Sequence, residues 1–243
     1  MPANYQLQLA ASQFRSANGI GPTDPIRLQS WLLKLDVMAM FKPLSDRFSG
    51  MAIRYDKHKF MLINANHRIS KQHFTVAHEL YHLFIQKEFV SEISNAGRFD
   101  RKDTNEYHAD CFAAYLLMPE EGILSLIPSS ELSKNKLSLP TLVKLEQYFA
   151  CSRSSLIFRL NEIGLIDRAK YEGYLQNVKL SALMLGYDAE LYEPGNAGLV
   201  IGNYGVKAKK LYDLEKISES HFFNLMSDIG IDITAIDAGN EQE

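Results

Sequence analysis

The segment His78-Glu79-Leu80-Tyr81-His82 combines residue types and spacing that suit a metal site. Residues four apart on a helix lie one turn above each other, with Cβ atoms about 5–6 Å apart, so both imidazoles can face one ion. Glu79 lies about 100° around the helix from His78, where its carboxylate can take a proton from a water beside the ion. The pattern predicts His78 and His82 as metal ligands and Glu79 as the general base.

A catalytic zinc ion typically has three protein ligands and one open position, so a third ligand must come from another segment. Glu106, in the segment NEYHAD, is the predicted ligand. Asp110, one helical turn later, is predicted to accept the outer N–H of a ligand histidine and so fix its tautomer. Two alternatives stay open at this point. His108 is a rival ligand, and Glu106 is also placed to close a capping box that begins at Asp103.

The chemistry expected of such a site is hydrolysis of an amide by water. Zinc lowers the pKa of a water molecule from about 16 toward about 7 and polarises the substrate carbonyl, so no cysteine nucleophile is required. Imidazole and carboxylate ligands also suit manganese and iron, which leaves the identity of the metal open. The group that stabilises the oxyanion is not identified by the sequence, and the candidates are Tyr107, Tyr115, His108 and residues of the C-terminal region.

The residues before the metal-binding pattern predict two helices and a small antiparallel sheet. The first helix is expected from Tyr5 to about Gly19, and the second from Ile26 to about Lys34 with Thr23 or Asp24 as its N-cap. Three short strands follow in the runs LDVMAMF, FSGMAIRYD and KFMLIN. The sheet is expected to pack on the helices that carry the metal ligands, with the substrate cleft beside its edge strand. An extended substrate would pair with that edge.

Helical spacing of apolar residues predicts the two helices that carry the candidate site. In the first, Phe74, Ala77, Tyr81 and Phe84 share one face. The second is capped by Asp103 or Thr104 and must end near Pro119, and residues 86–102 between them are expected to form a loop.

Beyond residue 138 the sequence predicts mainly helices. LPTLVKLEQYFA, CSRSS and LIFRLNEIGLI read as helix, turn and helix. A further helix is expected through YEGYLQNVKLSALML, an extended piece around GLVIGNYGVKAKKLY, and a last helix near SHFFNLMSDIG.

Composition narrows the class of protein. The chain has 243 residues, of which 46% are hydrophobic, so it can bury a core without help from a metal or a disulfide. Its formal charge of −3 provides no overall field for gripping phosphates. Cys111 and Cys151 are expected to be reduced thiols, the first residues lack a secretory pattern, and no apolar run is long enough to cross a bilayer. These features favour a cytoplasmic protein without a membrane partner.

FTVAHELYHLF followed by NEYHADCFAAYLLMP resembles the ImmA/IrrE-type metallopeptidases, whose pattern is HExxH on a helix and then E-x-x-A-[DN]-x-F-A-x-x-LLMP. The likeness covers roughly residues 5 to 165 and includes the strand with Gly50. It implies a gluzincin-like zinc endopeptidase that cleaves a separately encoded, repressor-like regulator of stress responses or mobile elements. The matching positions are His78, Glu79, His82, Glu106, Ala109, Asp110, Phe112, Ala113, Leu116, Leu117, Met118 and Pro119.

The expected fold is therefore α+β. It comprises a zincin-like metallopeptidase domain at residues 1–122, a helix-turn-helix-like subdomain at 123–168 and a mainly helical region of unknown role at 169–243.

Two other functions compete with the peptidase. The helix-turn-helix-like segment suits a DNA-binding regulator that uses Lys144, Arg153 and Arg159 on phosphates, although neighbouring acidic residues dilute the charge. A metal-binding interaction protein that does not cleave is the other alternative. The presence of Glu79, the predicted base, disfavours it.

Overall fold

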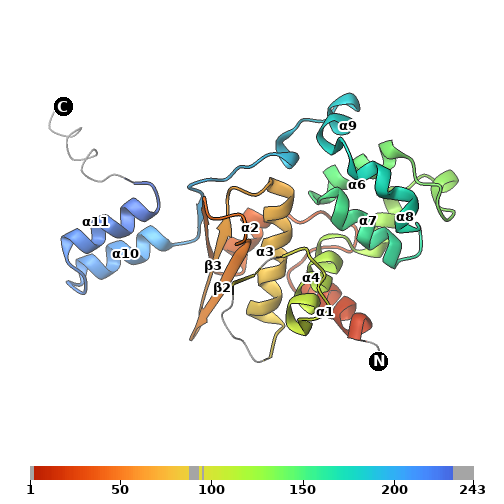
Figure 1. Ribbon diagram of the computed structural model, residues 1–243. Coiled ribbons are helices and arrows are strands. Elements are labelled where there is room, and N and C mark those ends of the chain that lie inside the picture. The colour runs from red at the N-terminus through yellow and green to blue at the C-terminus, as the bar shows by residue number, and fades with distance from the viewer. Residues whose placement is uncertain (1–2, 88–92, 95, 232–243) are drawn as a thin grey trace.

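A computed structural model of the chain describes residues 3–87, 93–94 and 96–231. It has a mixed α/β architecture, as the sequence predicts, in which helices surround one five-stranded sheet (Figure 1). Three short 3-10 segments are η1 (Ser129–Glu131), η2 (Glu172–Leu175) and η3 (Glu190–Tyr192). The strands are β1 (Val37–Lys42), β2 (Gly50–Tyr55), β3 (His58–Asn64), β4 (Ile93–Ser94) and β5 (Val200–Ile201). The helices are α1 (Ala3–Ala17), α2 (Leu28–Lys34), α3 (Ile69–Phe84), α4 (Thr104–Leu117), α5 (Glu120–Leu126), α6 (Leu139–Phe149), α7 (Arg153–Glu162), α8 (Arg168–Tyr171), α9 (Val178–Met184), α10 (Tyr204–Asp213) and α11 (Glu219–Asp228).

The sheet is mixed, with the strand order β4-β2-β3-β1-β5. β2 and β3 form an antiparallel hairpin around Asp56, whose φ of 52° lies in the left-handed region. β4 is antiparallel to β2 and β5 is antiparallel to β1, but β1 runs parallel to β3. The expectation of an antiparallel sheet is therefore wrong for this central pair.

The parallel pair arises because residues 43–49 carry the chain from the end of β1 across the end of β3 to the start of β2. Asn64, a fully buried residue at the end of β3, holds this crossover. Its side-chain carbonyl accepts from the backbone N–H of Leu44, and its amide donates to the carbonyls of Ser45 and Phe48, at 2.8–3.0 Å. One polar side chain thus replaces the backbone hydrogen bonds that a crossover cannot make within the sheet.

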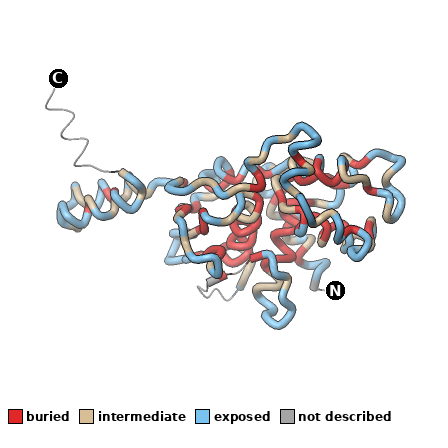
Figure 2. Tube along the Cα trace, turned by 45° about the horizontal axis from the view of Figure 1, so that its top comes forward, coloured by how far each residue is buried: buried red, intermediate tan, exposed pale blue. Residues whose placement is uncertain are grey.

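The centre of the molecule is formed by α3 and α4. α3 packs on β2 and β3, and α4 lies between α3 and α1. In Figure 2 the buried part of the chain is concentrated in these elements, whereas the α10–α11 hairpin at one end is mostly exposed. The predicted apolar face of α3 is confirmed, since Phe74, Ala77 and Tyr81 are buried. α4 is buried on all sides from Ala109 to Leu117, so it has no polar face.

The start of α2 differs from the prediction, because Arg27 rather than Thr23 or Asp24 precedes its first turn. The segment that was expected to begin the helix is held as a loop by Arg15, whose guanidinium is buried. Arg15 donates to the carbonyls of Gly21, Asp24 and Leu116. The Asp24 carboxylate accepts from the N–H of Gly21 instead of capping a helix.

The C-terminal region differs in two places. The helix expected across residues 171–185 is broken, because Asn177, between η2 and α9, has a φ of 51°. The extended piece expected across residues 198–212 is strand only at β5. Residues 204–213 form α10, which pairs with α11 through stacked rings of Tyr212 and Phe222.

This region is also tied to the centre of the molecule. The Glu193 carbonyl accepts from the N–H of Ile69 in the first turn of α3, and the Gly195 carbonyl accepts from the side chain of Gln72. Ile201 of β5 belongs to the main hydrophobic core, which also includes Leu7 of α1 and Leu160 of α7. The domain limits at residues 122 and 168 stay predictions.

Both cysteines, Cys111 and Cys151, are buried free thiols, and burial raises the pKa of Cys111 to about 11. Within the described residues, no helix combines the length and the apolar character needed to cross a bilayer.

We expect Asn64→Ala to lower the free energy of unfolding by about 2–3 kcal/mol, because it removes three hydrogen bonds to partly buried backbone groups of the crossover. Asn66→Ala removes a neighbouring, exposed amide that donates to the Leu44 carbonyl of the same crossover, and the loss of this solvent-exposed hydrogen bond should lower stability by about 1 kcal/mol or less. Urea unfolding of the two variants measures the difference. Equal stability would show that the crossover does not depend on Asn64.

Candidate metal centre

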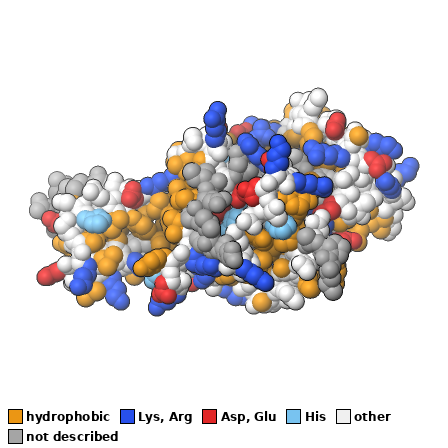
Figure 3. All heavy atoms as spheres, turned by 60° about the horizontal axis from the view of Figure 1, so that its bottom comes forward, with side chains coloured by type: hydrophobic (Ala, Val, Ile, Leu, Met, Phe, Trp, Pro, Cys, Tyr) orange, Lys and Arg blue, Asp and Glu red, His pale blue; other side chains and the backbone are white. Residues whose placement is uncertain are grey.

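α3 and α4 bring together the three residues that the sequence selects as metal ligands. His78 and His82 project from successive turns of α3, and Glu106 projects from the first turn of α4. One ligand atom from each lies within 4.8 Å of the other two, so the group could hold a metal ion. In Figure 3, histidine and acidic side chains lie next to each other near the middle of one face, with lysine and arginine side chains on both sides.

The spacing of these three atoms matches a tetrahedral ion. The Nε2 atoms of His78 and His82 are 3.1 Å apart, and each lies 3.3 Å from a carboxylate oxygen of Glu106. Ligand atoms placed tetrahedrally at about 2.0–2.1 Å from one ion are about 3.3–3.4 Å from one another. The three residues therefore fit a small divalent cation without rearrangement.

The outer nitrogens of the two imidazoles are both hydrogen-bonded. The Nδ1 atom of His78 lies 2.8 Å from Asp110 Oδ1, and Nδ1 of His82 lies 2.6 Å from the Gln86 side-chain oxygen. A carboxylate and an amide oxygen only accept, so each Nδ1 carries a proton and each Nε2 is the atom that faces Glu106. Both Nε2 atoms and the Glu106 carboxylate thus face one point, where a metal ion could take the place of the protons that otherwise lie between them.

Asp110 is itself fixed in place by the loop that precedes α4. The backbone N–H groups of Gly97 and Phe99 each donate to one of its carboxylate oxygens, both at 2.7 Å. The carboxylate is buried, and it accepts a hydrogen bond from each of its three polar neighbours. It therefore holds the His78 ring in one orientation, which is the role that the sequence predicts for it.

Glu79 lies beside the candidate ligands and is almost completely buried, with 1% of its surface exposed. Burial raises the pKa of its carboxyl group, while the charges of His78 and His82 and a hydrogen bond from the Ser94 hydroxyl act in the opposite direction. Ser94 also lies 3.0 Å from the Gly50 carbonyl oxygen. The proposed base is thus held from the edge of the sheet.

The site stabilises positive charge. Burial alone would lower the pKa of His78, but hydrogen bonds to Asp110 and Glu106 and the charge of Glu79 raise it to about 10. Burial alone would raise the pKa of Glu106, yet its hydrogen bonds to both histidines lower it to about 2. Three carboxylates therefore converge on two imidazoles, and a divalent cation would balance much of their charge.

The alternatives for α4 can be compared with this geometry. Asp103 caps the helix by accepting from the N–H groups of Asn105 and Glu106, but the Glu106 side chain is directed to the imidazoles rather than back to the cap. His108 lies about 200° around the helix from Glu106, so it faces away from His78. Glu106 and Asp110 share the face that meets α3.

Several residues of the site were missed by the sequence analysis. Gln86 follows His82 by four positions, the same spacing that links the two histidines, and this signal could have revealed it. Ser94 and the backbone groups of Gly97 and Phe99 lie in an irregular segment without periodic pattern. Only the folded chain brings them to the site.

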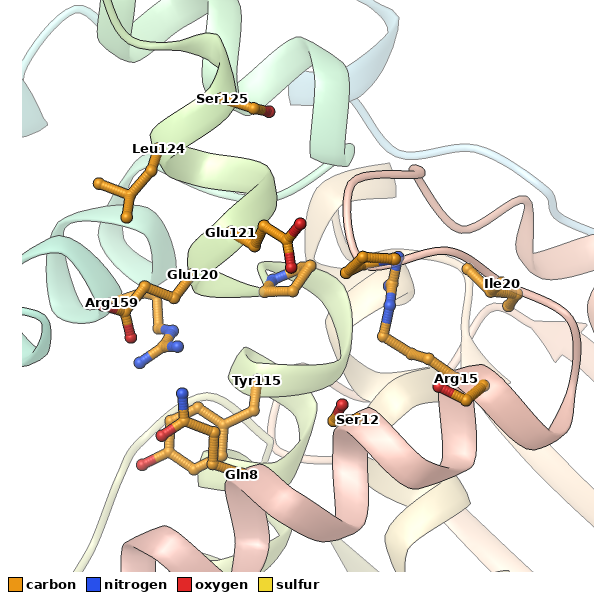
Figure 4. A pocket seen from close by; sticks show the side chains of 13 residues that line it. Gln8, Ser12, Arg15, Ile20, Tyr115, Glu120, Glu121, Leu124, Ser125 and Arg159 are labelled. Atoms are coloured by element: carbon orange, nitrogen blue, oxygen red, sulfur yellow. The ribbon is translucent and has the colours of Figure 1, made fainter.

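A separate cavity of about 650 Å³ lies at the other end of α4 (Figure 4). Tyr115 lines it, with its hydroxyl donating to Glu162 and its ring under the Arg159 guanidinium, 4.7 Å from the ring centre. Tyr115 therefore lies about one and a half turns of helix beyond Asp110, and its hydroxyl and ring are engaged by Glu162 and Arg159. This removes it from the candidates for stabilising an oxyanion.

Two of the three cations required by the DNA-binding alternative are buried. Arg153 and Arg159 are each 2% exposed. Arg153 forms an ion pair with Glu146 and donates to the Tyr174 carbonyl, and Arg159 donates to Met118 and Glu162. These guanidinium groups hold α7 against its neighbours and are not available to phosphates.

We expect Gly50→Ala to disturb the site from the sheet side. A Cβ atom at position 50 would lie 2.5 Å from the Thr75 methyl group and 3.0 Å from Glu79 Oε1, so the strand or the helix must move. The expected loss of stability is about 1–3 kcal/mol. Gly173→Ala is a matched control, because a Cβ there meets nothing within 4 Å. Thermal unfolding of both variants tests the contact, and equal melting temperatures would contradict it.

Asp110→Asn should weaken metal binding by about ten- to a hundredfold, because the amide cannot accept from His78 and from both backbone N–H groups as the carboxylate does. Competition with a chromogenic chelator gives the affinity. An unchanged affinity would reduce Asp110 to a packing residue.

Comparison with known proteins identifies the family to which the chain belongs. No curated protein matches the chain. A solved structure of a transcriptional regulator from Mycobacterium tuberculosis is 15% identical, with a TM-score of 0.42, over 66% of this chain and 52% of that one. The chain thus spans about half the length of that regulator. The profile of the IrrE N-terminal-like domain, peptidase family M78, matches residues 34–161, which include α3, α4 and all the residues of the candidate centre. The chain belongs to this metallopeptidase family, as the resemblance of its two helical motifs indicated.

Proposed function

We propose that the protein is a zinc-dependent endopeptidase that cleaves a repressor-like regulatory protein. The observation that carries the proposal is the convergence of three acceptor atoms, from His78, His82 and Glu106, beside a buried carboxylate. Three protein ligands leave one tetrahedral position for water, which is the arrangement of catalytic rather than structural zinc sites. Membership of the M78 family supports peptidase chemistry at this position.

Each residue of the centre has a distinct task in the proposed reaction. His78, His82 and Glu106 would hold the ion, which when bound supplies a Lewis acid for water and for the substrate carbonyl. Asp110 and Gln86 keep the proton of each imidazole on Nδ1, so that both Nε2 atoms stay available as ligands.

Glu79 would take the proton from the attacking water and pass it to the nitrogen of the leaving peptide. Its burial raises its pKa, which makes the carboxylate a stronger base than an exposed glutamate. The hydrogen bond from Ser94 fixes one carboxylate oxygen and so limits the orientations of the group. A base held in this way loses little entropy when the substrate arrives.

An extended substrate would approach the edge of the sheet next to Glu79. β4 pairs with β2 at Gly50 and Met51, so at this level the substrate would meet β4, the outermost strand, rather than β2. Pairing with a strand there would present backbone carbonyls to the ion. The choice of a repressor-like regulator as substrate rests on the resemblance to ImmA/IrrE-type metallopeptidases.

Glu79→Gln should keep one zinc ion per chain but lower the rate of cleavage by about 10²- to 10⁴-fold, because the amide cannot accept a proton. The measurement is incubation with co-encoded regulators, with and without chelator, followed by mass spectrometry of the products and metal analysis of the protein. Glu172→Gln, at an exposed position, is the control and should cut like the wild type. Undiminished cleavage by Glu79→Gln would overturn the assignment of the base.

A further inference from the structure

A second cavity, of about 610 Å³, lies between the first turn of α3, residues 96–98 and the first turn of α7. It adjoins the candidate metal centre, because Gly97 lines it and donates its N–H to Asp110, which in turn contacts His78. Nothing in the proposed chemistry uses this cavity.

The cavity is rich in positive charge. Arg68, Lys71 and Arg98 line it together with His67, and Asp46 is the one acidic residue among its described lining residues. Arg68 and Arg98 are exposed and Lys71 is half-buried, and none of the three forms a salt bridge with another described residue. Arg153 also lines the cavity but is paired with Glu146, so the other three cations outnumber Asp46 and leave the cavity with a net positive charge.

Further groups in the wall suit an anion. The first turn of α7 contributes the hydroxyls of Ser152, Ser154 and Ser155, which are hydrogen-bonded among themselves and can also donate to a ligand. Burial and the charge of Arg98 lower the pKa of Lys71, against the opposing charges of Asp46 and Asp110, so Lys71 and Arg98 are close enough to repel each other. An entering carboxylate would relieve that repulsion and would be only partly screened by solvent.

The position of Lys71 relates this cavity to the scissile bond. Lys71 and His78 are seven residues apart, so they lie on the same face of α3 and about 10 Å apart along its axis. An extended peptide advances about 3.3 Å per residue. A side chain in the cavity would therefore belong to a residue about three positions from the bond that is cut.

We propose that this cavity binds an acidic side chain, aspartate or glutamate, of the protein substrate, about three residues from the scissile bond. The inference rests on the proposed peptidase function, which supplies the substrate, and it adds the preference. Arg68, Lys71 and Arg98 act as specificity-determining residues, and the carboxylate of the substrate forms the close ion pair that these cations do not form with the described residues of the chain.

Direct binding tests the preference without relying on cleavage. The probes are two fluorescein-labelled peptides of the same length, one with several glutamates and its twin with glutamines at the same positions. Both are titrated with the Glu79→Gln protein, and the fluorescence anisotropy is measured at low and at high salt. The glutamate peptide should bind about tenfold more tightly, the scale of one partly desolvated ion pair, and salt should reduce the difference.

Substitutions in the cavity test whether the cavity causes the preference for the glutamate peptide. Lys71→Gln, and separately Arg68→Gln at an exposed position that cannot affect folding of the core, should each reduce the preference to about twofold or less. Lys136→Gln removes an exposed lysine that does not line the cavity and should leave the preference unchanged. Equal binding of the two peptides, or a preference that survives both cavity variants, would overturn the proposal.

Two different results would contradict the acidic binding site and the peptidase activity. If the wild type cuts the peptides or protein substrates but does not distinguish glutamate from glutamine, the peptidase stands and the acidic site is wrong. If the preference is present and depends on Lys71 while no substrate is cut, the site stands as an acidic binding site and the peptidase is wrong.

Discussion

The packing of α3 against α4 determines the positions of all the candidate metal ligands. Each helix alone carries an incomplete set of groups: two imidazoles on one, and two carboxylates on the other. The Asp110 carboxylate joins them through a buried hydrogen bond to His78, and the adjacent turn of α4 brings Glu106 to both imidazoles. A shift of one helix along the other by a single turn, about 5.4 Å, would separate all of these pairs. The register of this one helix pair is therefore the geometric requirement of the site.

This register has an unfavourable desolvation free energy, because charged groups lose hydration when they are buried. Glu79 and Asp110 are almost fully inaccessible, and His78 is completely so. The structure offsets the cost locally by giving each acceptor a donor: backbone N–H groups for Asp110, and a serine hydroxyl for Glu79. The two Nε2 atoms and the Glu106 carboxylate point toward a common centre. This unequal distribution of partners distinguishes a site prepared for a cation from an ordinary buried network.

The residues that could be predicted from the sequence are those whose relation is local or chemically obligatory. The imidazoles follow from helical spacing, and Glu106 and Asp110 follow from the need for a third ligand and for an acceptor on the outer nitrogen. Ser94 could not be found in this way, because its contact with Glu79 depends on how β4 pairs with β2. Strand direction was missed for a similar reason. Hydrophobic patterns show which residues face the core, but the parallel pairing of β1 and β3 depends on where a crossover lies. In the C-terminal region, glycines suggested extended chain, yet Gly205 lies within α10, at its contact with Met226 of α11.

The way in which the C-terminal region joins the body limits how the chain can be divided. The family profile ends at residue 161, but the first turn of α3 depends on carbonyl groups of Glu193 and Gly195, and β5 completes the sheet beside β1. At the other end, α1 packs against α4 and contributes Arg15, which lies outside the matched segment and donates to Leu116 in α4. The segment that the family profile matches is thus enclosed by flanking chain on both sides. Truncation at the limits of that segment would remove the donors and acceptors that the flanks supply to α3 and α4, and it would expose the faces that the flanks cover.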